Sequence, residues 1–384
     1  MLAIVLSGGG AKGAYEVGVW KALRKLHIKY DIVTGTSIGA LNGMMMTQKE
    51  FYKCLRLWKN INYDVLYDNF KQINNSKEMY LEYLNKIVEG GIDTVKIEQL
   101  INDNYKPNKL YNSKIAFGVV SYNLSTRKVV VSTKKNTRPD KLKKYILASA
   151  TCFPFFKPTK IDNDILVDGG YYDNLPINLA IELGATEIIA VDLGSIGFRK
   201  RIKNKDIKIT YIEPNNKLDS FLMFDSNVTK RMIKLGYNDT LKKFNKLDGN
   251  LYTFKKGTLT NLYYNYHNEI DDICNKLNYV GNFKNYDQKK FNKIIEDTLE
   301  IFKVKVDKIY NSYDLNKILL DKLEETKDIN FDKFDLDEIK KILDKSIVTK
   351  YIYLKLKNCD KINAVFNFFP KEFAAAIYLL AVRR

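Results

Sequence analysis

A glycine-rich loop between an apolar run and a helix-like stretch constrains this 384-residue chain most strongly. The apolar residues LAIVL (Leu2–Leu6) have the pattern of a buried strand, and SGGGAKGA (Ser7–Ala14) follows them directly. Gly8, Gly10 and Gly13 satisfy the G-x-G-x-x-G pattern of dinucleotide-binding loops. The same unhindered backbone amides would stabilise a tetrahedral oxyanion equally well. The loop alone therefore leaves nucleotide binding, oxyanion binding and a simple tight turn open.

A second strand–turn–helix pattern, YDIVTGTSIGALNG (Tyr30–Gly43), favours oxyanion binding over nucleotide binding. Asp31 precedes the strand-like residues, whereas a ribose-binding carboxylate would follow a second strand. The residues after the strand, Gly35–Gly39, form a G-x-S-x-G pentapeptide that leads into a helix-like stretch. This is the context of a nucleophile elbow, in which flanking glycines allow a sharp turn and the serine is presented at the amino end of the next helix. Ser37 is therefore the candidate nucleophile.

The two histidines of the chain are poor candidates for the base that a serine nucleophile needs. His27 lies in the first helix-like stretch, ahead of the elbow, and His267 lies far beyond the region that carries the motifs. Both are interpreted as partly exposed structural residues. A Ser-His-Asp triad is therefore not expected, and a carboxylate becomes the better candidate for the base.

The strongest candidate carboxylate is Asp168, in DILVDGGYYDNLP (Asp164–Pro176). It ends a short apolar run, and the glycines that follow leave its side chain unshielded at the carboxyl end of a strand, where catalytic groups of open α/β sheets gather. From the residues alone, a catalytic role and a turn or capping role for Asp168 are equally open. Asp173 and Asn174 are interpreted as caps of a helix that begins near Pro176.

Three motifs, GGGAKG, GTSIG and DGG, occur in this order and closely resemble those of the patatin-like phospholipases. The resemblance covers roughly residues 1–247 and implies a catalytic dyad of serine and aspartate without histidine, with no metal and no cofactor. It assigns Ser37 as nucleophile and Asp168 as base. It assigns the oxyanion hole to the glycine loop and its basic residue, that is, to Gly8, Gly9, Gly10, Lys12 and Gly13.

The resemblance also implies the reaction. The chain would be a lipid acyl hydrolase of the phospholipase A or lysophospholipase type, which cleaves carboxylic esters of phospholipid or another acyl lipid through an acyl-serine intermediate. The alternatives are a catalytically weak lipid-binding or scaffold protein with the same fold, and a nucleotide-binding oxidoreductase. Two positions depart from the family pattern: Ser7 stands where an acidic residue is frequent, and Lys12 stands where arginine is frequent. Lysine lacks the fixed fork of arginine.

Strand-like and helix-like runs alternate over the first two thirds of the chain, which predicts an α/β fold with a mostly parallel sheet between flanking helices. The runs KIAFGVV and KVVVS are expected to form a hairpin. We expect a patatin-like three-layer α/β/α catalytic domain over residues 1–248 and a mostly helical extension over residues 249–384, with a lid, packing or membrane-docking role. In the extension, one helix stripe is predicted from residues spaced by three or four, namely Phe291, Ile295, Leu299, Phe302, Val306 and Ile309.

The net charge of +18 indicates either a solvated basic surface or peripheral contact with anionic membrane surfaces. Lysines are spread along the whole chain, with short clusters such as FRKRIKNKDIK (Phe198–Lys208), and no recognisable nucleic-acid module accompanies them, so no nucleic-acid partner is expected. Four scattered cysteines and the lack of a leader pattern favour a cytoplasmic location. The oligomeric state stays open.

The carboxyl-terminal apolar run, Phe373–Val382, is shorter than the ~20 residues that a membrane-spanning helix needs. Its helix is expected either to pack into the core or to lie in a membrane interface with Arg383 and Arg384 at the headgroups.

Overall fold

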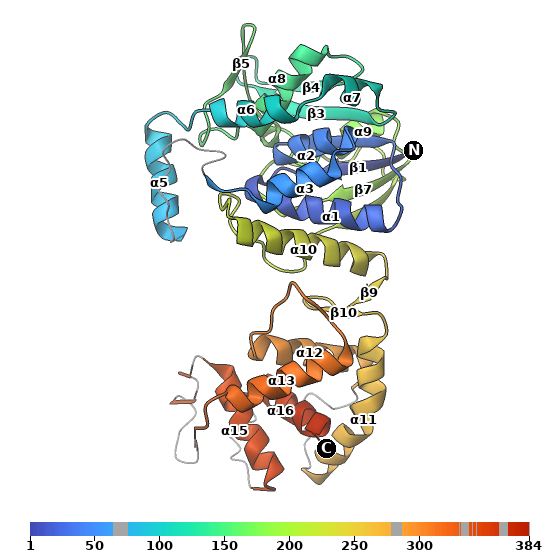
Figure 1. Ribbon diagram of the computed structural model, residues 1–384, viewed down its shortest axis with the longest axis vertical. Coiled ribbons are helices and arrows are strands. Elements are labelled where there is room, and N and C mark those ends of the chain that lie inside the picture. Colours follow the sequence, from blue (N-terminus) through green and yellow to red (C-terminus); the bar gives the residue numbers. More distant parts are fainter. Residues whose placement is uncertain are drawn as a thin grey trace. The chain divides into compact units, whose positions relative to one another are not determined.

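In the computed structural model the chain forms two compact units, Met1–Lys243 and Phe244–Arg384 (Figure 1). Each unit contains buried hydrophobic clusters of its own. The residues that the structure describes are 1–63, 76–277, 286–329, 331, 338–339, 341–342, 344–360 and 368–383. The two units are described separately below.

The first unit is built on an eight-stranded sheet of order β5-β6-β3-β2-β1-β7-β8, with β4 paired to β3. The strands are β1 (Leu2–Leu6), β2 (Ile32–Thr36), β3 (Ala116–Asn123), β4 (Lys128–Thr133), β5 (Thr159–Ile161), β6 (Asp164–Asp168), β7 (Glu187–Val191) and β8 (Lys208–Ile212). The strands β3, β2, β1, β7 and β8 are parallel, whereas β4 and β6 run antiparallel to β3. The predicted mostly parallel sheet and the predicted hairpin are confirmed. Strands β5 and β8 were not expected, because one is three residues long and the other is only half-buried.

Helices cover both faces of this sheet and complete three layers. On one face α9 packs against the apolar side chains Ala3, Val5 and Ile32. On the other face α2 contacts β2 and β3. The helices of the unit are α1 (Gly13–Lys25), α2 (Ile38–Thr47), α3 (Phe51–Lys59), α5 (Ser76–Val88), α6 (Val95–Asn104), α7 (Pro107–Asn112), α8 (Pro139–Ala150), α9 (Ile177–Glu182) and α10 (Ser226–Lys243).

Helices α1 and α10 lie side by side (Figure 1) at a distance that only glycine permits. A Cβ atom at Gly18 would collide with the carbonyl oxygen of Ile233, and one at Gly236 would collide with the carbonyl oxygen of Tyr15. Each helix therefore presents a glycine to the backbone of the other.

The register on β3 brings the carboxyl ends of β2 and β6 together. Thr36, the last residue of β2, pairs with Val120, and Asp168, the last residue of β6, pairs with Ser121. Because β2 is parallel to β3 and β6 is antiparallel to it, the two strands end at neighbouring residues of β3. The residue after Thr36 is Ser37, so both candidate catalytic residues lie at this point.

The second unit is mainly helical, with α11 (Thr258–Lys276), α12 (Gln288–Ile301), α13 (Ser312–Glu325), α15 (Lys345–Lys357) and α16 (Pro370–Arg383). It also contains a three-stranded sheet of β9 (Leu247–Asp248), β10 (Thr253–Lys255) and β11 (Ile309–Tyr310), which was not expected. The prediction of one helix stripe through Ile309 was wrong. Helix α12 ends at Ile301, two residues before the positive φ of Lys303, and Ile309 lies in β11.

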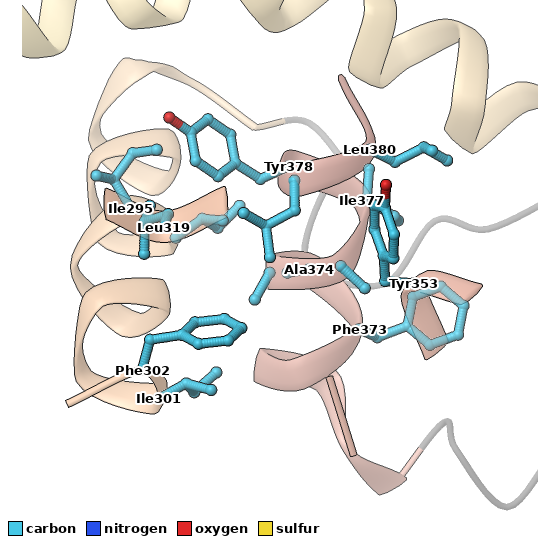
Figure 2. Packing of buried hydrophobic residues seen from close by; sticks show 14 of the residues in the cluster. Ile295, Ile301, Phe302, Leu319, Tyr353, Phe373, Ala374, Ile377, Tyr378 and Leu380 are labelled. Carbon is cyan, nitrogen blue, oxygen red and sulfur yellow. The ribbon is translucent and has the colours of Figure 1, made fainter. Parts of the chain in front are cut away.

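The apolar carboxyl-terminal run forms most of α16 and lies in the core of the second unit (Figure 2). Residues from Phe373 to Ala381 are all buried, and Tyr378 is fully enclosed. The Tyr378 hydroxyl donates a hydrogen bond to Oδ1 of Asn316 at 2.6 Å. Of the two interpretations of this run, packing into a core is confirmed; Arg384 lies outside the described residues. No helix among the described residues is long and apolar enough to cross a membrane.

Candidate active site

Ser37 occupies a sharp turn between β2 and α2 with φ 58° and ψ −127°. This backbone conformation is uncommon for a residue other than glycine. It persists only where the surrounding structure enforces it. A Cβ atom at Gly35 would collide with the backbone of Gly39, and one at Gly39 would lie 2.6 Å from the carbonyl oxygen of Leu6. The two glycines of the pentapeptide are therefore required by close backbone contacts, and the turn has the form of a nucleophile elbow.

Asp168 is buried, and its carboxylate interacts with the Ser37 side chain. Its Oδ1 accepts a hydrogen bond from the amide of Gly170 at 2.7 Å. Burial raises the pKa of Asp168 to about 6, and the interactions with Ser37 and Gly170 oppose part of that rise. The structure thus brings together the two residues that the sequence analysis selected as nucleophile and base.

The glycine loop leaves two backbone amides without a partner beside Ser37. The amide of Gly8 donates to the carbonyl oxygen of Asn174 at 3.0 Å, and the amide of Lys12 donates to that of Gly9 at 3.1 Å. Within the part of the chain that the structure describes, the amides of Gly9 and Gly10 have no hydrogen-bond acceptor. Both glycines line the cavity described below. Two of the five residues predicted for the oxyanion hole, Gly9 and Gly10, thus have amides that are available to donate a hydrogen bond to a ligand.

The other predicted loop residues lie around these two amides in different roles. Gly8 approaches Ser37 closely, since a Cβ atom added there would lie 3.0 Å from Cβ of Ser37. Lys12 is half-buried and lines the cavity; burial and the nearby Lys217 lower its pKa. Gly13 begins α1 and contacts α2 at Ile38.

An apolar cavity of about 710 Å³ opens over Ser37, Asp168 and the glycine loop. Its walls come from α2, α3, α6 and the segments 150–156 and 221–224. Phe153, Phe155, Phe156 and Cys152 line it. Burial raises the pKa of the Cys152 thiol to about 12. Cavities of this size and apolarity are typical of sites for apolar ligands.

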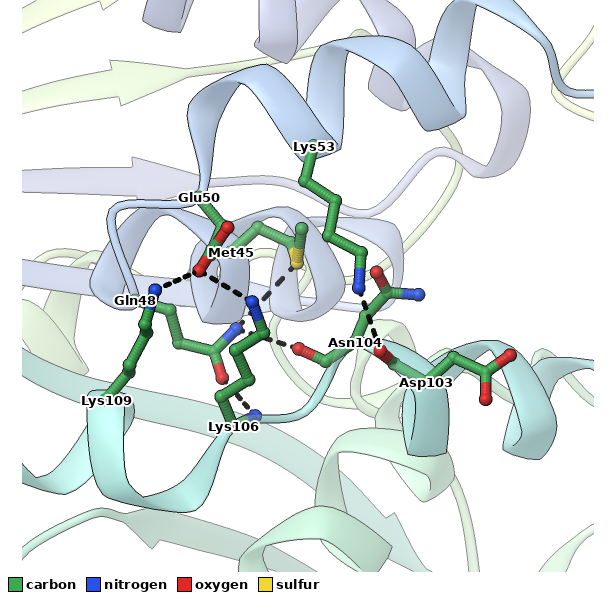
Figure 3. Close-up of polar contacts among 8 residues, drawn as sticks. All are labelled: Met45, Gln48, Glu50, Lys53, Asp103, Asn104, Lys106 and Lys109. Atoms are coloured by element: carbon green, nitrogen blue, oxygen red, sulfur yellow. Dashed lines mark hydrogen bonds and ion pairs between the residues drawn. The ribbon is translucent and has the colours of Figure 1, made fainter.

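A polar cluster holds the α6 wall of the cavity against the turn between α2 and α3 (Figure 3). Glu50 pairs with Lys106 at 2.8 Å and with Lys109 at 2.6 Å. These two cations lower the pKa of Glu50 to about 2. The side-chain amide of Gln48 donates to the carbonyl oxygen of Asn104 at 3.1 Å. The wall is therefore fixed by charge and hydrogen bonding as well as by apolar packing.

Ser149 was not predicted as a site residue, yet it holds the backbone of the nucleophile. Its buried Oγ accepts a hydrogen bond from the amide of Ser37 at 2.9 Å and donates one to the carbonyl oxygen of Val120 at 2.6 Å. The local sequence did not predict this role, because a serine between two alanines near the end of a helix-like stretch gives no indication of a contact with a distant strand.

Asn174 and Asp173 do not cap a helix, so that prediction was wrong. Helix α9 starts at Ile177, and its N-cap position is Pro176 without a side-chain hydrogen bond. The carbonyl oxygen of Asp173 accepts a hydrogen bond from Thr36 at 2.8 Å, and that of Asn174 accepts one from Gly8. The backbone carbonyls of both residues thus hold the end of β2 and the glycine loop in place, and neither side chain caps a helix.

The two histidines lie away from the cavity, as expected. His27 is exposed at the end of α1, and His267 is half-buried in α11, where its Nδ1 lies 3.2 Å from the carbonyl oxygen of Tyr263. Neither lines the cavity over Ser37.

Comparison with known proteins identifies the part of the chain that carries the site. A model of the patatin-like phospholipase family matches residues 4–181, which contain all three motifs. This part of the chain is therefore similar to the patatin-like phospholipase domains, and the resemblance inferred from the motifs is confirmed.

Individual relatives are long proteins. The chain is 27% identical over 200 residues to patatin-like phospholipase domain-containing protein 7 of Rattus norvegicus, a match that covers 50% of this chain and 14% of that protein. It is 29% identical over 207 residues to neuropathy target esterase sws of Drosophila melanogaster, a match that covers 50% of this chain and 13% of that protein. The chain thus spans about a seventh of the length of these relatives. A crystal structure of VipD from Legionella pneumophila is similar with a TM-score of 0.43 and 15% identity, over 99% of this chain and 90% of that one.

Proposed function

We propose that this chain is a lipid acyl hydrolase of the phospholipase A or lysophospholipase type that uses Ser37 and Asp168 as a catalytic dyad. The observation that carries the proposal is that the strand register brings Ser37, at the elbow, beside the buried Asp168, and that both line one apolar cavity. The match of residues 4–181 to the patatin-like phospholipase family supports it.

In the proposed mechanism Asp168 accepts the proton of the Ser37 hydroxyl while Oγ attacks the ester carbonyl carbon. The amides of Gly9 and Gly10 donate hydrogen bonds to the resulting oxyanion; one such donor contributes ~3 kcal/mol in a comparable site. Collapse of this intermediate expels the alcohol or lysolipid, which takes the proton from Asp168. Water then transfers a proton to Asp168 and attacks the acyl-serine carbonyl carbon. Collapse of this second intermediate releases the fatty acid, and Asp168 returns the proton to Oγ of Ser37.

The proposal includes the surroundings of the enzyme. A net charge of +18 suits peripheral contact with anionic membrane surfaces, and four free cysteines suit a reducing cytoplasm. The substrate is a phospholipid or another acyl lipid whose chain enters the apolar cavity.

The test compares hydrolysis of a chromogenic medium-chain ester by the wild type, Ser37→Ala and Asp168→Asn, with a chelator present. We expect each substitution to lower kcat by about a thousandfold or more, as in other enzymes whose nucleophile and base act as a unit. Asp173→Asn is the matched control, because Asp173 is also buried with a pKa raised to about 6. Wild-type activity that survives Ser37→Ala would refute the proposal. An inactive wild type that binds lipid would favour the lipid-binding or scaffold alternative.

A further inference from the structure

Three large apolar side chains are exposed at the mouth of the cavity. Ile196 is 99% exposed, Phe198 is 66% exposed and Phe153 is 39% exposed, and all three line the cavity. Single exposed apolar residues are common on protein surfaces, but a group of them around one opening marks an interaction site. These residues are the apolar part of what is called the mouth patch below.

A basic run continues directly from this apolar group. Residues 198–208, FRKRIKNKDIK, contain six basic residues and one acidic residue. Within the run, Arg199 pairs with the buried Asp192 at 2.7 Å. Lys200 and Arg201 are exposed, and neither forms an ion pair among the residues that the structure describes. The amide of Lys200 donates to Oδ1 of Asp173 at 3.4 Å, and its Nζ lies 3.7 Å from the centre of the Tyr172 ring. These two cations complete the mouth patch, which consists of Phe153, Ile196, Phe198, Lys200 and Arg201.

Backbone hydrogen bonds fix the mouth patch to the catalytic loops. The amide of Phe198 donates to the carbonyl oxygen of Gly170 at 2.9 Å, and its own carbonyl oxygen accepts from the amide of Asn174 at 2.6 Å. The carbonyl oxygen of Asn174 in turn accepts from Gly8 in the glycine loop. The side-chain amide of Asn178 donates to the carbonyl oxygen of Arg201 at 3.0 Å. The backbone that carries these exposed side chains is therefore held in a fixed position relative to the loops around Ser37 and Asp168.

We propose that the mouth patch docks the protein on an anionic lipid bilayer. Ile196 and Phe198 insert among the acyl chains, while Lys200 and Arg201 contact the phosphates of the headgroups. Exposed apolar side chains flanked by cations have the chemistry of an interfacial binding surface, and the cations complement an anionic bilayer. The choice of a bilayer as partner rests on the proposed lipid hydrolase function. In this orientation the cavity faces the membrane, so that an acyl lipid reaches Ser37 without crossing bulk water.

Binding is measured by sedimentation with vesicles of phosphatidylcholine alone and vesicles that also contain phosphatidylserine, in a Ser37→Ala background so that no lipid is consumed. We expect Lys200→Gln/Arg201→Gln to weaken binding to the anionic vesicles about 25-fold, which is about fivefold for each cation. Lys114→Gln/Lys135→Gln is the matched control. It removes the same charge near the amino-terminal end of β3, the sheet edge away from Ser37, and is expected to leave most of the binding in place.

The apolar part of the patch is tested separately. Ile196→Ser/Phe198→Ser is expected to weaken binding to both kinds of vesicle by about tenfold or more, whereas Ile196→Leu/Phe198→Leu retains it. Circular dichroism confirms that each variant is folded. Equal weakening by the two cation pairs, or equal affinity of the wild type for both kinds of vesicle, would overturn the proposal. So would self-association that is lost in Ile196→Ser/Phe198→Ser while vesicle binding persists, because the patch would then bind a second copy of the chain.

Separate measurements distinguish a failure of the docking proposal from a failure of the proposed hydrolase function. In a chain with Ser37 restored, Lys200→Gln/Arg201→Gln should hydrolyse a soluble short-chain ester at the wild-type rate and anionic vesicle lipid more slowly. Because binding is measured without Ser37, a wild type that hydrolyses no ester would refute the proposed function without changing the binding result.

Discussion

At the residue scale, the ionisation of Asp168 sets the expected pH dependence. Burial raises its pKa to about 6, and only the ionised carboxylate can accept the proton of Ser37. Because the acid form is inactive as a base, kcat/KM should fall as the pH drops through about 6 and should be level above it. A pH–rate profile measures this. Asp173→Asn is expected to keep the same profile, and loss of the inflection in that variant would assign it to Asp173.

Substitution of Ser149 tests whether this residue positions the backbone of Ser37 without contributing to substrate binding. Ser149→Ala leaves the amide of Ser37 and the carbonyl oxygen of Val120 without their partner. We expect kcat to fall about tenfold with little change in KM, because the nucleophile loses its support while the cavity stays intact. Ser121→Ala is the control, since Ser121 is equally buried but donates only a long hydrogen bond of 3.4 Å to Val130. Unchanged kcat in Ser149→Ala would contradict this role.

At the scale of elements, the contact between α1 and α10 depends on glycine. Alanine is ordinarily the better helix former by ~1 kcal/mol, yet Gly18→Ala would place a methyl group against the carbonyl oxygen of Ile233. We expect it to lower the free energy of unfolding by about 1–3 kcal/mol through overpacking. Thermal melting measures the change. Gly43→Ala, in α2, is the control, because its methyl group would meet only side-chain atoms, at 3.1 Å; equal destabilisation by both would contradict the argument.

At the scale of the whole molecule, the two units have separate cores and the candidate site lies in one of them. Ser37, Asp168 and the cavity belong to Met1–Lys243, whereas α16 and its buried neighbours belong to Phe244–Arg384. We expect a chain of residues 1–243 to fold and to hydrolyse a soluble ester at a rate close to that of the complete chain. Calorimetry of the complete chain should show two transitions. An unfolded fragment or a single transition would show that the units depend on one another.

The parts of this molecule that local patterns encode were predictable from the sequence. Ser37 and Asp168 each stand at the end of an apolar run beside glycines, and such patterns specify a strand and a turn without knowledge of distant residues. Ser149 and Asn174 could not be placed in this way, since their partners lie on strands and loops far away in the sequence. The small sheet of the second unit was missed because strands of two or three residues carry no periodicity.

The meeting of β2 and β6 on β3 has a consequence for insertions and deletions. Loop lengths can change freely without altering which residues of β3 are paired, so the number of residues between Ser37 and Asp168 carries no chemical meaning. A single inserted residue within β6, however, would shift the pairing at Ser121 and turn Asp168 to the opposite face of the sheet. The same holds for β2, where the shift would move Ser37. The relative position of the proposed catalytic residues thus depends on the register of two short strands, where the insertion of one residue is enough to change it.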